Sequence, residues 1–361
     1  MHEVLFWQPV KGRFEVKPMA GDLVNFAGYL FSAIGPVPAY RAVIIATPGF
    51  SEAVAGGAWG AQWVGLGIKR KAQGPSHAIL GTLGASKLLD LNPAGFTWSL
   101  AEATDGSQQV GTRSPRSGNP GGALLWRGSA RSVVMLNPAG YRFSQALSVS
   151  SGRQAGYAQT SAGREHAALW TGTAASFVDL NPVGFISSDV FAMDGKREAG
   201  CGMISDNRVH ALVWSGTAKS ARDINPNGYV WSKAKGIFED LIVGDAEAIG
   251  EKAPHTLLWH DTAGKIIDLN PKGYAASWAV ATNGRKEVGW GDRKRGKLPG
   301  ALVWKGSAAS VIDLQKFLPQ GMVSSQAFAV TRNGTILGFA VVPAQRREAA
   351  VAWIPIRQVK Q

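Results

Sequence analysis

The sequence predicts an all-β protein, a β-propeller whose blades each contain four antiparallel strands and about 45 residues. The first observation is a repeated Asn-Pro pair, whose asparagines stand at intervals of 45, 44, 44 and 45 residues. The copies are Asn92-Pro93, Asn137-Pro138, Asn181-Pro182, Asn225-Pro226 and Asn270-Pro271. Four short strand patterns fill each interval, and small residues occupy the first of them. A regular period of this length is typical of a propeller, a solenoid or an array.

The interval that follows Asn92-Pro93 shows the four strands in order. Residues 99–103 alternate with period two, and Asp105-Gly106 then provides a two-residue hairpin signal, because glycine readily takes a positive φ. Residues 109–112 form the second strand, the apolar residues 123–126 the third and residues 132–136 the fourth. The next Asn-Pro pair ends the repeat, since proline cannot donate to a strand ladder.

Two residue types that recur at equivalent positions of the repeats indicate where each strand lies in the blade. Small residues recur in the first strand, as at Ala101 and Ala103, and a tryptophan ends most copies of the third strand, as at Trp170 and Trp214. Propeller strands converge at the axis, so we expect the first strand to be innermost and the tryptophans to fill the wider space further out. No segment keeps a period of 3.6 residues, so we expect little helix.

The number of blades depends on how the N-terminal residues are counted. First strands number seven, but a third strand can be counted eight times if Ser32-Ala33 is included. We favour eight blades in a single propeller domain of residues 1–361, with seven blades and an elaborated N-terminal segment as the alternative. The approximate repeats are then 1–48, 49–93, 94–138, 139–182, 183–226, 227–271, 272–316 and 317–361.

Composition limits the class of protein. The 361 residues carry a net charge of +13 and a single cysteine, Cys201, which excludes an intrachain disulfide and which we expect to be buried. The N-terminus lacks the features of a signal peptide. Prolines and Arg41 interrupt the most apolar window, residues 23–46, so we expect no membrane span. No motif predicts a cofactor, a metal site or a catalytic residue, and we expect a monomer.

The motif His-Ala-x-Leu-Trp, as at His166–Trp170, follows a Val-Gly strand and precedes Asp-Leu-Asn-Pro. This pattern resembles the bacterial extracellular repeat called the HAF family, over roughly residues 30–355. The family has a Gly-Thr-rich turn where this chain has Asp90-Leu91-Asn92-Pro93. The resemblance implies a propeller-like fold and an exported protein. It implies no activity and no catalytic residues.

Basic residues gather between the second and third strands of successive repeats. They are Lys69, Arg70, Lys71, Arg113, Arg116, Arg164, Arg208, Lys252, Arg293, Lys294, Arg295, Lys297, Arg346 and Arg347. Since strands alternate in direction, we expect these loops to share one face with the Asn-Pro turns. Such a face would bind an anionic glycan, an acidic protein or a nucleic acid through contacts with its charges. The alternative is a solvated basic rim, because acidic residues stand in the same loops.

Repeat-wide polar residues have a structural interpretation. We expect the histidines at 77, 166, 210 and 255 to bond to neighbouring turns, and the recurrent serines and aspartates to serve turns or blade contacts. A functional site should instead break the repeat, as Asp189, Lys233 and Lys235 do, and these three would line the channel. A non-enzymatic binding propeller is our leading hypothesis. An enzyme acting at the channel mouth, such as a polysaccharide lyase or hydrolase, and a structural surface protein are the alternatives.

Overall fold

The computed structural model describes residues 39–69, 74–113, 121–294, 298–343 and 347–356, together with strands β1 (Glu3–Gln8) and β2 (Arg13–Pro18). Strands β1 and β2 pair in an antiparallel register within one compact unit. Residues Tyr40–Pro355 form the second compact unit, which contains the propeller.

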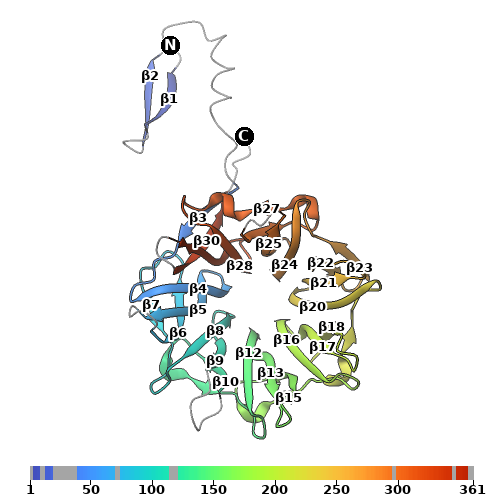
Figure 1. The fold of residues 1–361 in the computed structure, drawn as a ribbon. Helices are drawn as coiled ribbons and strands as arrows, with labels where there is room; N and C mark the ends of the chain where they lie inside the picture. The colour runs from blue at the N-terminus through green and yellow to red at the C-terminus, as the bar shows by residue number, and fades with distance from the viewer. Residues whose placement is uncertain are drawn as a thin grey trace. The chain divides into compact units, whose positions relative to one another are not determined.

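Seven antiparallel sheets of four strands are arranged as a ring in this second unit (Figure 1). We number the blades I to VII along the chain and give the strands of each from the axis outward. Blade I contains β4 (Phe50–Trp59), β5 (Gln62–Lys69), β6 (Ser76–Thr82) and β7 (Leu88–Asp90). Blade II contains β8 (Ser99–Thr104), β9 (Gln109–Arg113), β10 (Gly122–Trp126) and β11 (Val134–Met135). Blade III contains β12 (Phe143–Ser150), β13 (Arg153–Gln159), β14 (Glu165–Trp170) and β15 (Val178–Asp179).

The remaining four blades continue the ring. Blade IV contains β16 (Ser187–Asp194), β17 (Arg197–Met203), β18 (Val209–Trp214) and β19 (Arg222–Asp223). Blade V contains β20 (Tyr229–Phe238), β21 (Leu241–Ala248), β22 (His255–His260) and β23 (Lys265–Asp268). Blade VI contains β24 (Tyr274–Thr282), β25 (Glu287–Arg293), β26 (Gly300–Trp304) and β27 (Ile312–Asp313). Blade VII contains β28 (Ser324–Val330), β29 (Ile336–Val342), β30 (Arg347–Pro355) and β3 (Tyr40–Ile44).

The two ends of the propeller chain meet in blade VII. Strand β3 pairs antiparallel with β30, with Ala42 opposite Trp353, so a strand from the N-terminal side becomes the outermost strand of the last blade. Backbone pairing between the two ends holds the ring closed and covers an edge of β30 that would otherwise lack a partner strand.

The favoured count of eight blades is therefore wrong, and the alternative of seven is correct. Residues 40–44 supply one outer strand to blade VII instead of ending a blade of their own. The third-strand copy expected at Ser32-Ala33 lies outside the described residues. A sequence period cannot distinguish the two counts, because a blade that is shared between the chain ends leaves partial copies of the repeat at both ends.

A β-bulge shapes every innermost strand and explains the glycine of the second strand. In blade III the register shifts between Ala146 and Ser148, so Leu147 is an extra residue without a partner. The bulge places the backbone against Gly156 of β13, where a Cβ atom would lie 1.9 Å from the carbonyl oxygen of Gln145. The same close approach recurs in all seven blades, so only glycine fits this position.

The core lies between adjacent blades. Trp170 of blade III packs with Ala146 and with Val110 and Leu125 of blade II, and all four are fully buried. Fully buried alanines also occupy the innermost strands of other blades, as at Ala101 and Ala234. The predicted positions of the small residues and of the tryptophans are thus confirmed.

Helix is limited, as expected, to short 3₁₀ turns in the part of the chain that the structure describes. These are η2 (Ala130–Ser132), η3 (Ala174–Ser176), η4 (Ala218–Ser220), η5 (Ala308–Ser310) and η6 (Leu314–Phe317). Among the described residues no helix has the length and apolar character needed to cross a lipid bilayer.

The strand directions define two faces of the propeller. We call the end that carries the hairpins between first and second strands, such as Asp194-Gly195, the hairpin face. The opposite end carries the connections between second and third strands and the Asn-Pro turns, and we call it the loop face.

Candidate functional site

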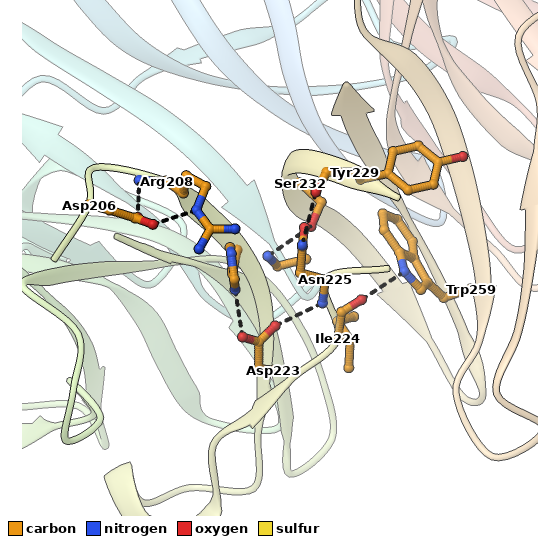
Figure 2. A network of polar contacts seen from close by, with 10 residues as sticks. Asp206, Arg208, Asp223, Ile224, Asn225, Tyr229, Ser232 and Trp259 are labelled. Carbon is orange, nitrogen blue, oxygen red and sulfur yellow. Dashed lines mark hydrogen bonds and ion pairs between the residues drawn. The ribbon is translucent and has the colours of Figure 1, made fainter. Parts of the chain in front are cut away.

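On the loop face, one hydrogen-bond network joins blade IV to blade V (Figure 2). Asp223 bonds to the Nδ1 atom of His210 at 2.6 Å and accepts the backbone N–H of Asn225 at 2.8 Å. Ser232 of β20 donates to the Oδ1 atom of Asn225 at 2.6 Å and accepts the N–H of Ala211 in β18 at 3.0 Å. The network therefore ties a turn and a third strand of one blade to the innermost strand of the next.

The same network recurs around the ring. The His–Asp contacts are His77–Asp90, His166–Asp179, His210–Asp223 and His255–Asp268. The serine bonds are Ser99–Asn92, Ser144–Asn137, Ser188–Asn181, Ser232–Asn225, Ser277–Asn270 and Ser325–Gln315. The structural interpretation of these repeated residues is confirmed, so they are not candidates for a reactive site.

Several basic residues of the loop face contact the protein itself. Lys69 lies 2.7 Å from Asp90, Arg208 lies 2.6 Å from Asp206 and Arg293 pairs with Asp313. Arg113 is 4% exposed and lies over the ring of Phe96, 4.7 Å from its centroid. Arg347 donates to the carbonyl oxygen of Ser51 at 3.3 Å. These contacts offset part of the positive charge of the face.

Three other basic residues of the loop face, Arg164, Lys252 and Lys294, are exposed. None of them forms an ion pair with a described residue. The remaining residues predicted for this face lie outside the described residues: Arg70, Lys71, Arg116, Arg295, Lys297 and Arg346. The described part of the face therefore presents separated cations.

The axis of the propeller is lined by two rings of half-buried side chains from the innermost strands. The upper ring, nearer the loop face, consists of Val54, Leu100, Gln145, Asp189, Lys233, Trp278 and Gln326. The lower ring, nearer the hairpin face, consists of the seven bulge residues Gly56, Glu102, Leu147, Phe191, Lys235, Val280 and Phe328. In both rings the residue type changes from blade to blade, whereas the buried positions beside them carry similar residues in most blades.

A cavity of about 820 Å³ opens at the hairpin end of the axis. All seven residues of the lower ring line it, together with residues of the hairpins that follow, such as Trp59, Asn283 and Arg332. Because every blade contributes to its wall, the cavity is a product of ring closure. Its lining combines aromatic, aliphatic and charged side chains.

One wall of the channel is polar and comes from blades II to V. The Oε1 atom of Glu102 accepts a hydrogen bond from Gln145 at 2.7 Å, and the hydroxyl of Tyr157 donates to Gln145 at 3.0 Å. Burial raises the pKa of Glu102, although the bond from Gln145 opposes the rise. Lys235 lies over Phe191, 3.8 Å from the ring centroid, and burial lowers the pKa of its ammonium group.

Further charged groups lie near this wall, in the upper ring and on the strands behind it. Burial, followed by the nearby Glu165, raises the pKa of Asp189 to about 7, although Lys235 and Lys233 act in the opposite direction. Burial also raises the pKa of Asp245, which lies opposite Lys233 in the strand register. Among the described residues no ion pair joins these carboxylates to the two lysines. Their charges therefore act on one another without direct contact.

The other wall is aromatic and comes from blades VI and VII. Trp278 and Trp290 stack with ring centroids 5.9 Å apart, and Trp290 meets Phe328 edge-on at 5.7 Å. Phe328 in turn stacks on Phe339 at 5.8 Å. Aromatic pairs with these separations are mutually stabilising, so the four rings form one packed cluster in these two blades.

The described residues support neither a metal site nor a reactive thiol. They contain no group of three or more His, Cys, Asp or Glu side chains that could hold a metal ion. Cys201 is buried, as expected, and burial raises the pKa of its thiol to about 12, which disfavours the reactive thiolate.

Sequence reasoning found only part of this site. The structure places Asp189 and Lys233 in the upper ring and Lys235 in the lower ring, where Lys235 lines the cavity. Glu102, Phe191 and Phe328 were missed. For Glu102 and Phe328 the available signal was a position between the two small residues of the first strand, which is also the position of Lys235, whereas Phe191 follows Val190 and lacks this signal. Tyr157 and Asp245 stand on second strands and carry no comparable signal.

The chain matches no protein-family model and no curated protein. Among solved structures, it is similar to puromycin hydrolase, with a TM-score of 0.54 and 10% identity over 86% of this chain and 54% of that one. The chain thus spans about half the length of that enzyme. It is also similar to oligogalacturonate lyase from Vibrio parahaemolyticus, with a TM-score of 0.53 and 8% identity over 89% of this chain and 98% of that one.

A third similar structure is the β-propeller domain of the Trilobed protease from Pyrococcus furiosus. The TM-score is 0.56 and the identity 8%, over 84% of this chain and 96% of that one. At such low identity these likenesses show a shared propeller fold and carry no activity over to this chain.

Proposed function

We propose that this protein binds a small organic ligand in the axial cavity of the hairpin face. The observation that carries the proposal is the contrast between repeated and unrepeated residues. The repeated Asp, His and Ser residues hold blades together, whereas the residues that differ from blade to blade gather around the axis. The volume of about 820 Å³ lies in the range of small-molecule sites, which combine apolar walls with a few polar groups.

A series of substitutions at Gly56 tests this proposal. Gly56 is the lower-ring residue without a side chain, and an added Cβ atom would meet its nearest neighbour at 3.5 Å, an ordinary contact distance. Phenylalanine already occupies the equivalent bulge position at Phe191 and Phe328. The variants Gly56→Ala, Gly56→Leu and Gly56→Phe therefore fill the cavity in steps.

The measurement is binding of a small-molecule library by ligand-observed NMR. We expect hits whose affinity falls progressively along the Gly56 series. Val183→Phe, which adds an aromatic ring at a fully exposed turn, controls for a general effect of added bulk. Hits that bind equally well to Gly56→Phe, or a complete absence of hits, would contradict the proposal.

The loop face is a second candidate, supported by the exposed Arg164, Lys252 and Lys294. A polyanion bound there should dissociate as the salt concentration rises. Charge reversal of these three residues should weaken binding to heparin at low salt, while Gly56→Phe should leave it unchanged. Unaltered heparin binding by the charge-reversed variant would exclude this face.

A further inference from the structure

We propose that the ligand of the axial cavity is a small zwitterion with an apolar body, such as a free dipeptide. In this arrangement the ligand's carboxylate lies at Lys235 and its ammonium group lies at Glu102. The inference rests on the proposed function, because it names the ligand class of the same cavity.

The lower ring contains a pair of opposite charges. Glu102 and Lys235 are the two charged residues among its seven members, and both line the cavity. Glu102 belongs to β8 of blade II and Lys235 to β20 of blade V, which lie on opposite sides of the ring (Figure 1). A ligand that spans the cavity therefore meets a carboxylate on one side and an ammonium group on the other.

Neither charge has an ion-pair partner among the described residues. Glu102 receives a hydrogen bond from the neutral amide of Gln145, and Lys235 lies against the ring of Phe191. Removing a charge from water without an opposite charge is costly. A zwitterionic ligand supplies the missing charge on each side.

The other charged residues that line the cavity already have partners within the protein. Asp105 accepts the backbone N–H groups of Ser107 and Gln108 in its own hairpin. Asp194 accepts the N–H of Glu239 at 2.7 Å, and Arg332 lies over the ring of Trp59. These groups hold the rim, so Glu102 and Lys235 are the charges that remain for a ligand inside.

Apolar side chains line the cavity between the two charges. Leu147, Val280 and Phe328 are apolar members of the lower ring, and Val149 and Ile237 line the cavity below it. A ligand that carried charges alone would leave this surface without contact. An apolar side chain on the ligand would bury it, which favours binding.

The test is calorimetric titration with the free dipeptides composed of Phe, Leu, Ala and Gly. For the tightest binder, an N-acetyl derivative removes the ammonium group and a C-terminal amide removes the carboxylate. We expect each derivative to bind about ten- to a hundredfold more weakly, as the loss of one charged hydrogen bond predicts.

Two variants assign each end of the ligand to one residue. Glu102→Gln should weaken the free dipeptide but leave the N-acetyl derivative's affinity unaltered, because that derivative no longer carries the charge that Glu102 recognises. Lys235→Met should weaken binding of the free dipeptide but leave the affinity of the amide derivative unaltered, because that derivative no longer carries the charge that Lys235 recognises. Glu251→Gln and Lys219→Met remove equivalent charges at exposed positions away from the cavity and serve as matched controls.

Thermal unfolding of each variant separates lost binding from lost folding. Derivatives that bind as well as the free dipeptide, or variants that weaken all three compounds equally, would overturn the inference. If the library compounds whose binding Gly56→Phe blocks are all uncharged, the inference of a zwitterionic ligand is overturned. The proposed binding of a small organic ligand in the cavity would remain supported. If no compound of either set binds in a way that Gly56→Phe blocks, both proposals fail.

Discussion

The hydroxyl of Ser232 donates to the Oδ1 atom of Asn225 at 2.6 Å while it accepts the backbone N–H of Ala211 at 3.0 Å. Ser232 belongs to the innermost strand of blade V, whereas its two partners belong to blade IV and to the turn that follows it. The side chain is fully buried, so water cannot replace either bond. One hydroxyl thus connects adjacent blades, and its equivalents do so around the ring.

Replacing this hydroxyl should destabilise the propeller. We expect Ser232→Ala to lower the free energy of unfolding by about 1–3 kcal/mol, because a buried N–H and a buried amide oxygen lose their partner. Chemical denaturation monitored by tryptophan fluorescence measures the change. Ser215→Ala, at an exposed position in the turn that follows β18 of blade IV, is the control. Equal stabilities for the two variants would contradict the structural role of the serine.

The closure of the ring should depend on Tyr40, the first residue of β3. Tyr40 is 3% exposed, packs in the core beside Trp353 and accepts a hydrogen bond from the Nζ atom of Lys286 at 2.7 Å. We expect Tyr40→Ala to lower the free energy of unfolding by about 3–5 kcal/mol, as for other large aromatic residues that are truncated in a core. Tyr40→Phe keeps the ring and should cost about 1 kcal/mol. Thermal and denaturant unfolding of the pair would reveal the difference, and equal losses would argue against packing as the main contribution.

Neighbouring cations of the loop face should differ in their contribution to stability. Arg293 pairs with Asp313, and the two side chains are 23% and 12% exposed, whereas Lys294 is exposed and has no ion pair among the described residues. We expect Arg293→Gln to cost about 1–3 kcal/mol, because it leaves a largely buried carboxylate without its partner. Lys294→Gln should change stability by less than about 0.5 kcal/mol. Denaturant unfolding compares the two, and a reversed order would show that the ion pair adds nothing.

Much of the fold was predictable from the sequence because each blade repeats its own local rules. Asp194-Gly195 predicted a hairpin between two strands, and the structure places it between β16 and β17. The number of blades was not predictable, because it depends on the pairing of Ala42 with Trp353 across most of the chain. A local pattern cannot show which distant strand becomes its partner.

The candidate site was predictable where a residue broke the repeat with a charge, as at Asp189, Lys233 and Lys235. It was missed at Phe191 and Phe328, because an uncharged residue at a position that varies between blades does not stand out in the sequence. Only the bulge determines that these residues face the cavity. Long-range packing also determines how Asp189 titrates, because burial and then the charge of Glu165 in the preceding blade raise the pKa of its carboxyl group.

Asp189 should make the stability of the protein depend on pH. Burial, and then the charge of Glu165, raises the pKa of its carboxyl group in the folded state to about 7, compared with 3.8 for an ordinary aspartate. Between these two values the folded state binds more protons than the unfolded state. The contribution of Asp189 to stability is therefore fully present below pH 4 and is lost as the pH rises through 7.

Asp189→Asn removes this titration, so its stability relative to the unmodified protein should rise between pH 4 and pH 8. Each unit of pKa difference corresponds to about 1.4 kcal/mol, and we expect a relative gain on the order of 2–4 kcal/mol. Denaturant unfolding across this pH range measures it. Asp206→Asn should show no such rise between pH 4 and pH 8, because hydrogen bonds from Arg208 lower the pKa of that aspartate from 3.8 and its titration therefore lies below this range. A stability difference for Asp189→Asn that stays constant with pH would show that Asp189 remains ionised in the folded channel throughout the range. The two lysines beside it would then govern its charge more strongly than burial does.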